Sequence, residues 1–171
     1  MNLAVFASGR GSNLEALIER VGNGLLPAQI ALVLSNNSGS GALTVARQNG
    51  IPTAHLSGTT HPDETAYRNR MLRLLESHKI NLIVLAGFMK LLPPQVVARY
   101  TKRIINIHPA PLPRFGGPGM FGLAPHRAVL AAGLKESAVC VHYVTEAYDQ
   151  GPLIASSPVA VHSNDTPEDL Q

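Results

Sequence analysis

The chain has 171 residues, of which 45% are hydrophobic and 15% charged, and this is enough for one domain with its own core. No run approaches the roughly 20 apolar residues of a membrane-spanning helix, and the first residues lack the charged start and the length of a signal peptide. The formal charge of +3 comes from scattered Lys and Arg, and with 5% aromatic residues the sequence predicts small-molecule ligands rather than nucleic acid or a membrane.

Strand-like and helix-like runs alternate along most of the chain. Continuous apolar strands joined by helices predict a parallel sheet that is covered on both faces. The last two strands lie close together around a short turn, so we expect them to pair antiparallel. The predicted fold class is therefore α/β: a doubly wound, mostly parallel twisted sheet with an antiparallel C-terminal extension. The expected strands span 2–8, 29–36, 51–56, 80–88, 103–108, 138–144 and 152–161, and the helices 12–21, 41–50, 64–78, 93–100 and 125–132.

The sequence shows no internal repeat, low-complexity tract or linker, so residues 1–171 are expected to form a single domain. Near the end, Thr166 is a good helix N-cap and Pro167 suits the first helical position. The sequence stops within about one turn, and an isolated helix of that length is unstable. We therefore expect the domain to be truncated here and the natural protein to continue beyond Gln171.

The loop after the first strand, "SGRGSN", has the composition of a phosphate cradle. Gly9 and Gly11 allow a tight turn, and Ser12 and Asn13 begin a helix whose free N–H groups face an anion. The third glycine of a dinucleotide fingerprint is absent, because Leu14 stands there. A single phosphate is the favoured ligand, and a plain glycine turn is the alternative.

The loop after the fourth strand, "LAGFMKLLPP", combines flexibility with apolar surface. Gly87 permits close approach of a ligand, while Met89, Leu91 and Leu92 surround one cation, Lys90. Such a segment can line the pocket of a flat heteroaromatic ligand. The alternative is a set of core residues that lead into the next helix.

The fifth strand ends in two polar residues, Asn106 and His108, which alternation places on one face. Three prolines follow within five residues and restrict the chain behind them. Asp149 lies in the loop between the last two strands, where it could reach His108 and favour the imidazolium, a general acid. An amide, an imidazole and a carboxylate together can polarise a carbonyl, stabilise an oxyanion and move protons. Taken alone, a histidine at a strand end is more often structural.

Four motifs in this order, "SGRGSN", "LAGFMKLL", "NIHPAPLP" and "VHYVTEAYDQGPLI", resemble the phosphoribosylglycinamide formyltransferase family of folate-dependent enzymes. The resemblance runs over the whole chain. It implies a Rossmann-like formyltransferase fold and transfer of the formyl group of 10-formyltetrahydrofolate to the amine of 5-phosphoribosylglycinamide (glycinamide ribonucleotide), in de novo purine synthesis. The formyl folate is a co-substrate, and the resemblance implies no metal.

The resemblance also implies roles for individual residues. Asn106, His108 and Asp149 would form the catalytic set, and the peptide bond before Pro113 would be cis. Two positions depart from the family pattern: Lys90 and Glu64 stand where arginines are common. The residues expected to bind the phosphorylated substrate are Gly11, Ser12, Asn13, Gly87 and Pro109, and those expected to bind the folate are Met89, Lys90, Leu91, Leu92 and Asn106.

Other functions stay open at this stage. A formyltetrahydrofolate hydrolase or a methionyl-tRNA formyltransferase core would share the catalytic set, and a non-catalytic nucleotide-binding module would need only the phosphate loop. A hydrolytic metal site using His108, His126 and His142 lacks a recognised spacing, and His142 is expected beside the site instead. The single cysteine, Cys140, lies mid-strand without an obvious base and agrees with a cytoplasmic protein. The oligomeric state is open, with a homodimer as one expectation.

Overall fold

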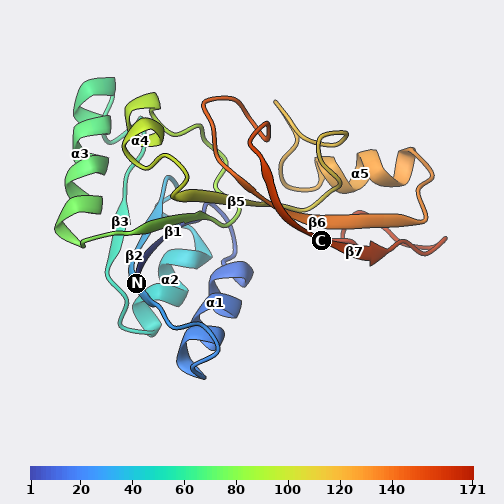
Figure 1. Cartoon of the computed structure of the whole chain (residues 1–171), viewed down its shortest axis with the longest axis horizontal. Helices are drawn as coiled ribbons and strands as arrows, with labels where there is room; N and C mark the ends of the chain where they lie inside the picture. The colour runs from blue at the N-terminus through green and yellow to red at the C-terminus, as the bar shows by residue number, and fades with distance from the viewer. The chain divides into compact units, whose positions relative to one another are not determined.

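The computed structural model describes all residues from Met1 to Gln171, which form two compact units, Met1–Ile104 and Ile105–Gln171 (Figure 1). The strands are β1 (Asn2–Phe6), β2 (Gln29–Ser35), β3 (Thr53–His55), β4 (Leu82–Leu85), β5 (Ile104–His108), β6 (Glu136–Tyr143) and β7 (Leu153–Ala160). The helices are α1 (Ser12–Gly22), α2 (Gly41–Gln48), α3 (Glu64–Ser77), α4 (Pro94–Arg99) and α5 (Ala124–Ala131).

The strands of the first unit run parallel in the order β3-β2-β1-β4. In Figure 1, α1 and α2 lie on one side of these strands, and α3 and α4 lie on the other. The strand order reverses between β1 and β4, and ligands of open α/β sheets bind beyond the carboxyl ends of the strands at such a point. The loops after β1 and β4 therefore form the expected binding edge of this unit.

The core of the first unit explains why these segments become strands and helices. Strand side chains such as Phe6, Leu34 and Ile83 are fully buried, and helix α1 adds Leu14 from its inner face. Burying each such side chain is worth roughly 1.5–3 kcal/mol. The N-cap of α3 is Asp63, whose carboxylate accepts a hydrogen bond from the Ala66 N–H at 2.7 Å.

In the second unit, β5, β6 and β7 pair antiparallel in that order. The register places Asn106 opposite His142 across the β5–β6 pair. Helix α5 contributes Val129 to a core cluster with Ala110, Phe115 and Val161. The predicted α/β class, the parallel strands of doubly wound order and the antiparallel extension are thus confirmed, and the peptide bond before Pro113 is cis, as expected.

The helix start signal at Thr166 is followed by turns rather than by a helix. The capping contacts nevertheless form. The Thr166 Oγ1 accepts from the Asp169 N–H at 3.3 Å, and a carboxylate oxygen of Asp169 accepts from the Thr166 N–H at 2.8 Å. None of the helices in the structure combines the length and the apolar character that crossing a membrane requires.

Candidate active site

The loop after β1 turns directly into helix α1. Gly11 has a φ of +99°, which glycine adopts without strain, and a Cβ there would lie 2.8 Å from the Cα of Ala42. Gly11 is also the N-cap, so no side chain caps the first N–H groups of the helix. The next residues, Ser12 and Asn13, are exposed. The positive end of α1 is therefore accessible to an anion, where the sequence predicts one.

Ser8 connects this loop to the loop after β4. Its Oγ accepts a hydrogen bond from the Met89 N–H at 2.9 Å and donates one to the Asn36 side-chain oxygen. The N–H of Ser8 donates to the Gly87 carbonyl at 3.0 Å, and Gly87 has a φ of +75°. The structure thus brings the predicted substrate residue Gly87 and the start of the predicted folate segment against the strand that carries the phosphate loop.

The predicted folate segment is divided between surface and core. Met89 and Leu91 are 42% and 47% exposed, which is unusual for such apolar side chains, whereas Leu92 is buried. Leu91 and Lys90 line a pocket of about 530 Å³. Glu64 lines the same pocket, so the two positions that depart from the family pattern lie in the wall of one pocket. Sequence reasoning missed the rest of this wall, which includes Ser57, Thr59, His61 and Tyr67.

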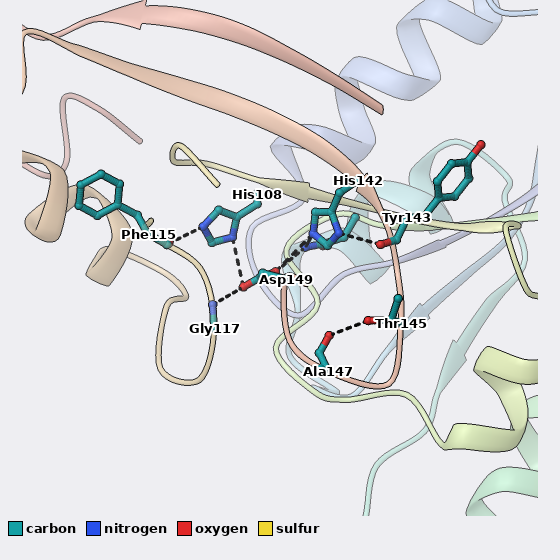
Figure 2. A network of polar contacts seen from close by, with 9 residues as sticks. His108, Phe115, Gly117, His142, Tyr143, Thr145, Ala147 and Asp149 are labelled. Carbon is teal, nitrogen blue, oxygen red and sulfur yellow. Dashed lines mark hydrogen bonds and ion pairs between the residues drawn. The ribbon is translucent and has the colours of Figure 1, made fainter. Parts of the chain in front are cut away.

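In the second unit, one carboxylate lies between two buried imidazoles (Figure 2). Asp149 Oδ2 is 3.6 Å from His108 Nδ1, and Asp149 Oδ1 is 3.4 Å from His142 Nε2. Oδ2 also accepts a hydrogen bond from the Gly117 N–H at 3.0 Å. The side chain of Asp149 is 10% exposed, and those of the histidines are 3% and 2% exposed. The ionised carboxylate is therefore supported by protein groups rather than by bulk water.

The turn between β6 and β7 holds Asp149 in place. Asp149 has a φ of +52°, in the left-handed region that aspartate tolerates better than most residues. Gly151 follows, and a Cβ there would collide with the carbonyl of Tyr143. Only glycine therefore fits at position 151. The turn directs the Asp149 carboxylate toward the strands of the second unit.

His108 has both ring nitrogens directed at protein acceptors. Its Nε2 is 2.7 Å from the Phe115 carbonyl, which can only accept, so Nε2 carries a proton. Its Nδ1 faces Asp149. Asn106, two residues earlier on β5, donates from Nδ2 to Asp149 Oδ1 at 3.2 Å. Two of the predicted catalytic side chains, Asn106 and His108, therefore converge on the third, Asp149. Pro109 follows His108 directly in the chain.

Burial, hydrogen bonds and neighbouring charges shift the pKa values of Asp149, His142 and His126. Burial raises the pKa of Asp149, but hydrogen bonds from His142 and Gly117 and the nearby imidazoles outweigh it and hold that pKa below its ordinary value. Burial lowers the pKa of His142, yet the bond to Asp149, the Tyr143 carbonyl and the carboxylate charge raise it above its ordinary value. Burial and the proximity of His108 lower the pKa of His126.

Sequence reasoning placed His142 beside the site, but missed that it contacts Asp149 directly and missed the backbone of Phe115 and Gly117. The glycine pair after Phe115 was the only signal for this backbone approach. Cys140 is buried, and its Sγ lies 3.6 Å from the Ser156 hydroxyl. No three His, Cys, Asp or Glu side chains are grouped so that they could hold a metal ion.

A formyl transferase family model matches residues 1–171. The chain belongs to the formyl transferase family. It is 39% identical over 169 residues to the chloroplastic phosphoribosylglycinamide formyltransferase of Arabidopsis thaliana, a match that covers 98% of this chain and 58% of that protein. It is 35% identical to the phosphoribosylglycinamide formyltransferase of Escherichia coli (strain K12), over 99% of this chain and 78% of that protein.

Solved structures agree with this membership. The glycinamide ribonucleotide transformylase 1 of Symbiobacterium toebii superimposes with a TM-score of 0.91 at 34% identity, covering 99% of this chain and 78% of that one. This formyl transferase chain therefore shares the fold of that enzyme over nearly its whole length. It spans little more than half of the length of the plant relative.

Proposed function

We propose that the protein transfers the formyl group of 10-formyltetrahydrofolate to the amine of 5-phosphoribosylglycinamide. The observation that carries this proposal is the convergence of Asn106 and His108 on Asp149, whose carboxylate lies 3.2 Å from Asn106 Nδ2 and 3.6 Å from His108 Nδ1. Burying a carboxylate and two imidazoles is costly, and a module that only bound a nucleotide would have no use for them. Membership of the formyl transferase family supports the same reaction.

Binding of the two substrates is assigned to the first unit's loops and to Pro109. The phosphate of the acceptor would meet the N-terminus of α1 at Gly11, Ser12 and Asn13, because that helix end has no capping side chain. The folate would contact the exposed apolar side chains of Met89 and Leu91 and enter the pocket beside Lys90. Asn106 is the remaining proposed folate contact, and Gly87 is the remaining proposed substrate contact. The buried Leu92 supports the 89–92 segment from the core.

The chemistry follows from the negative charge that develops on the formyl oxygen. The acceptor amine attacks that carbon, a new C–N bond forms, the bond to the folate N10 breaks, and the proton lost by the amine is balanced by one gained at N10. His108 supplies the proton as general acid from Nε2, which must first leave the Phe115 carbonyl, and Asp149 stabilises the imidazolium from the Nδ1 side. The Asn106 amide donates to the oxyanion. In the structure this amide is engaged with other partners, so it must exchange them before it can donate.

Three further assignments rest on the same proposal. Residues 1–171 would act as a single formyltransferase domain. The compartment would be the cytoplasm, although the Arabidopsis relative is named a chloroplastic enzyme. A homodimer stays a prediction that sedimentation would test.

A steady-state assay with glycinamide ribonucleotide and 10-formyl folate tests the activity. We expect formyl transfer that depends on the acceptor, and a loss of about 10²–10³ in kcat for Asn106→Ala, the effect of removing one oxyanion donor. Asn23→Ala is the matched control, since Asn23 is the exposed C-cap of α1. Folate turnover at the same rate without acceptor would identify a hydrolase, and binding without turnover would identify a non-catalytic module.

A further inference from the structure

The side-chain nitrogen of Asn106 has two acceptors at once. Its Nδ2 lies 3.1 Å from His142 Nε2 and 3.2 Å from Asp149 Oδ1. The same Nε2 and Oδ1 are 3.4 Å apart, so the three atoms form a closed triangle. Asn106 and His142 are directly opposite each other in the β5–β6 pair. The strand register therefore holds Asn106 Nδ2 close to His142 Nε2.

The other ring nitrogen of His142 decides which tautomer is present. Nδ1 lies 2.8 Å from the Tyr143 carbonyl, which only accepts hydrogen bonds, so Nδ1 carries a proton in every state. In the neutral imidazole, Nε2 is then an acceptor. The two hydrogens of the Asn106 amide match the two acceptors, Nε2 of His142 and Oδ1 of Asp149. Both hydrogens are used, and only the oxygen of the amide is left for a reactant.

A proton on His142 Nε2 reverses this arrangement. The protonated nitrogen donates, so it can form the ion pair with Asp149, but it can no longer accept from Asn106. An amide nitrogen held 3.1 Å from an N–H group is unfavourable. The hydrogen that Asn106 had donated to Nε2 loses its acceptor and becomes free to donate elsewhere, while the other amide hydrogen stays on Asp149 Oδ1.

We propose that His142 is a positioning residue whose protonation state decides whether an N–H of the Asn106 amide is free to donate to a reactant. The neutral form keeps both amide hydrogens on His142 and Asp149, and the protonated form releases the hydrogen that an oxyanion requires. The part that concerns catalysis rests on the proposed formyl transfer, whereas the coupling between His142 and the amide does not. His142 thus acts through Asn106 and need not touch either substrate.

The charged and titratable groups around His142 favour the protonated form. Asp149, from the β6–β7 turn, is the charged group that contacts it, and the contact raises the pKa of His142 despite burial. From β5 come the uncharged Asn106 and, on the other carboxylate oxygen, His108.

Nuclear magnetic resonance on the unaltered protein tests the coupling without any assay of activity. The imidazole nitrogens of His142 and the side-chain amide of Asn106 would be followed together through a pH titration. We expect Nε2 of His142 to titrate while Nδ1 stays protonated, and the Asn106 amide signals to move with the same midpoint. Amide signals that stay unchanged through the His142 titration would overturn the proposal.

A double-mutant cycle tests the catalytic consequence. His142→Leu should lower kcat by about 10- to 100-fold, within the effect of losing one oxyanion donor, and leave both KM values within about threefold. In an Asn106→Ala background the same change should cost almost nothing further. His142→Gln, whose amide can donate at any pH, should restore part of the rate, and exposed His162→Leu is the control. An equal loss with and without Asn106 would show that His142 is only structural.

Discussion

Replacing Asp149 by Asn should move the pKa of His142 from above its ordinary value of 6.5 to below it. Burial is the largest influence on that pKa and lowers it, and Asp149 contributes both a hydrogen bond and a charge that raise it. The variant keeps the size of the side chain but removes the charge. Only the Tyr143 carbonyl then opposes burial, and its effect is smaller than that of burial.

The size of the effect follows from the short distance between the charges. Two unit charges 3.4 Å apart attract by about 5 kcal/mol at an effective dielectric constant of 20, and this is an upper limit. Burial of both groups offsets much of it. We therefore expect the variant to lose about 1.5–3 kcal/mol of unfolding free energy, the range for a hydrogen bond to a charged group.

The loss should depend on pH in a defined window. The raised pKa of His142 stabilises the fold fully below 6.5, and this contribution disappears as the pH rises through the native pKa. The lowered pKa of Asp149 stabilises the fold above 3.8, and this contribution disappears as the pH falls through the native pKa. The deficit of Asp149→Asn should therefore be largest between these two values and smaller in alkaline solution.

Urea unfolding in mildly acidic and in alkaline buffer, with an NMR titration of His142, measures both effects. Glu146→Gln is the matched control, because Glu146 is an exposed carboxylate in the same loop. The reasoning fails if the deficit is the same in both buffers, or if His142 in the variant still titrates above its ordinary value.

Three other variants test the loops. Gly11→Ala should lose about 2–4 kcal/mol in chemical denaturation, because φ is +99° and the new Cβ would lie 2.8 Å from the Ala42 Cα; a loss below about 0.5 kcal/mol would contradict this. Asn13→Asp should raise the KM for the phosphorylated acceptor far more than it lowers kcat in steady-state assays, by charge repulsion at the α1 N-terminus, and an unchanged KM would remove this loop from the site. Gly151→Ala should destabilise the β6–β7 turn and weaken the His142–Asp149 contact, seen as a lower Tm and a lower His142 pKa, whereas Gly22→Ala, which has open space around it, should do neither.

Much of the fold could be predicted because its signals are local. The apolar runs that became β1 and β2 are continuous, as buried parallel strands require, and the structure ends them within about two residues of the expected bounds. The two glycines of "SGRGSN" indicate a tight turn, and the second of them, Gly11, has the positive φ. At Thr166 the capping contacts form without a helix, because a cap starts a helix but one turn cannot sustain it.

The candidate site was predictable only in part, because its decisive contacts join segments far apart in the chain. Alternation placed Asn106 and His108 on one face, but only the register of β5 with β6 puts His142 opposite Asn106. No pattern indicates that the Phe115 carbonyl would occupy a ring nitrogen of His108. The acceptor in this contact is a backbone carbonyl, which every residue type carries, so the amino-acid sequence does not mark it.

One carboxylate serves both imidazoles, because Oδ2 of Asp149 faces His108 and Oδ1 faces His142. Its single negative charge balances one positive charge in this buried place, and a second positive charge would stay uncompensated there. The contact with Asp149 raises the pKa of His142, so removing the charge shortens the pH range over which His142 holds its proton. Since that proton releases an N–H of Asn106, we expect the alkaline limb of the pH–rate profile to move toward lower pH in Asp149→Asn, and a limb that stays in place would contradict the coupling.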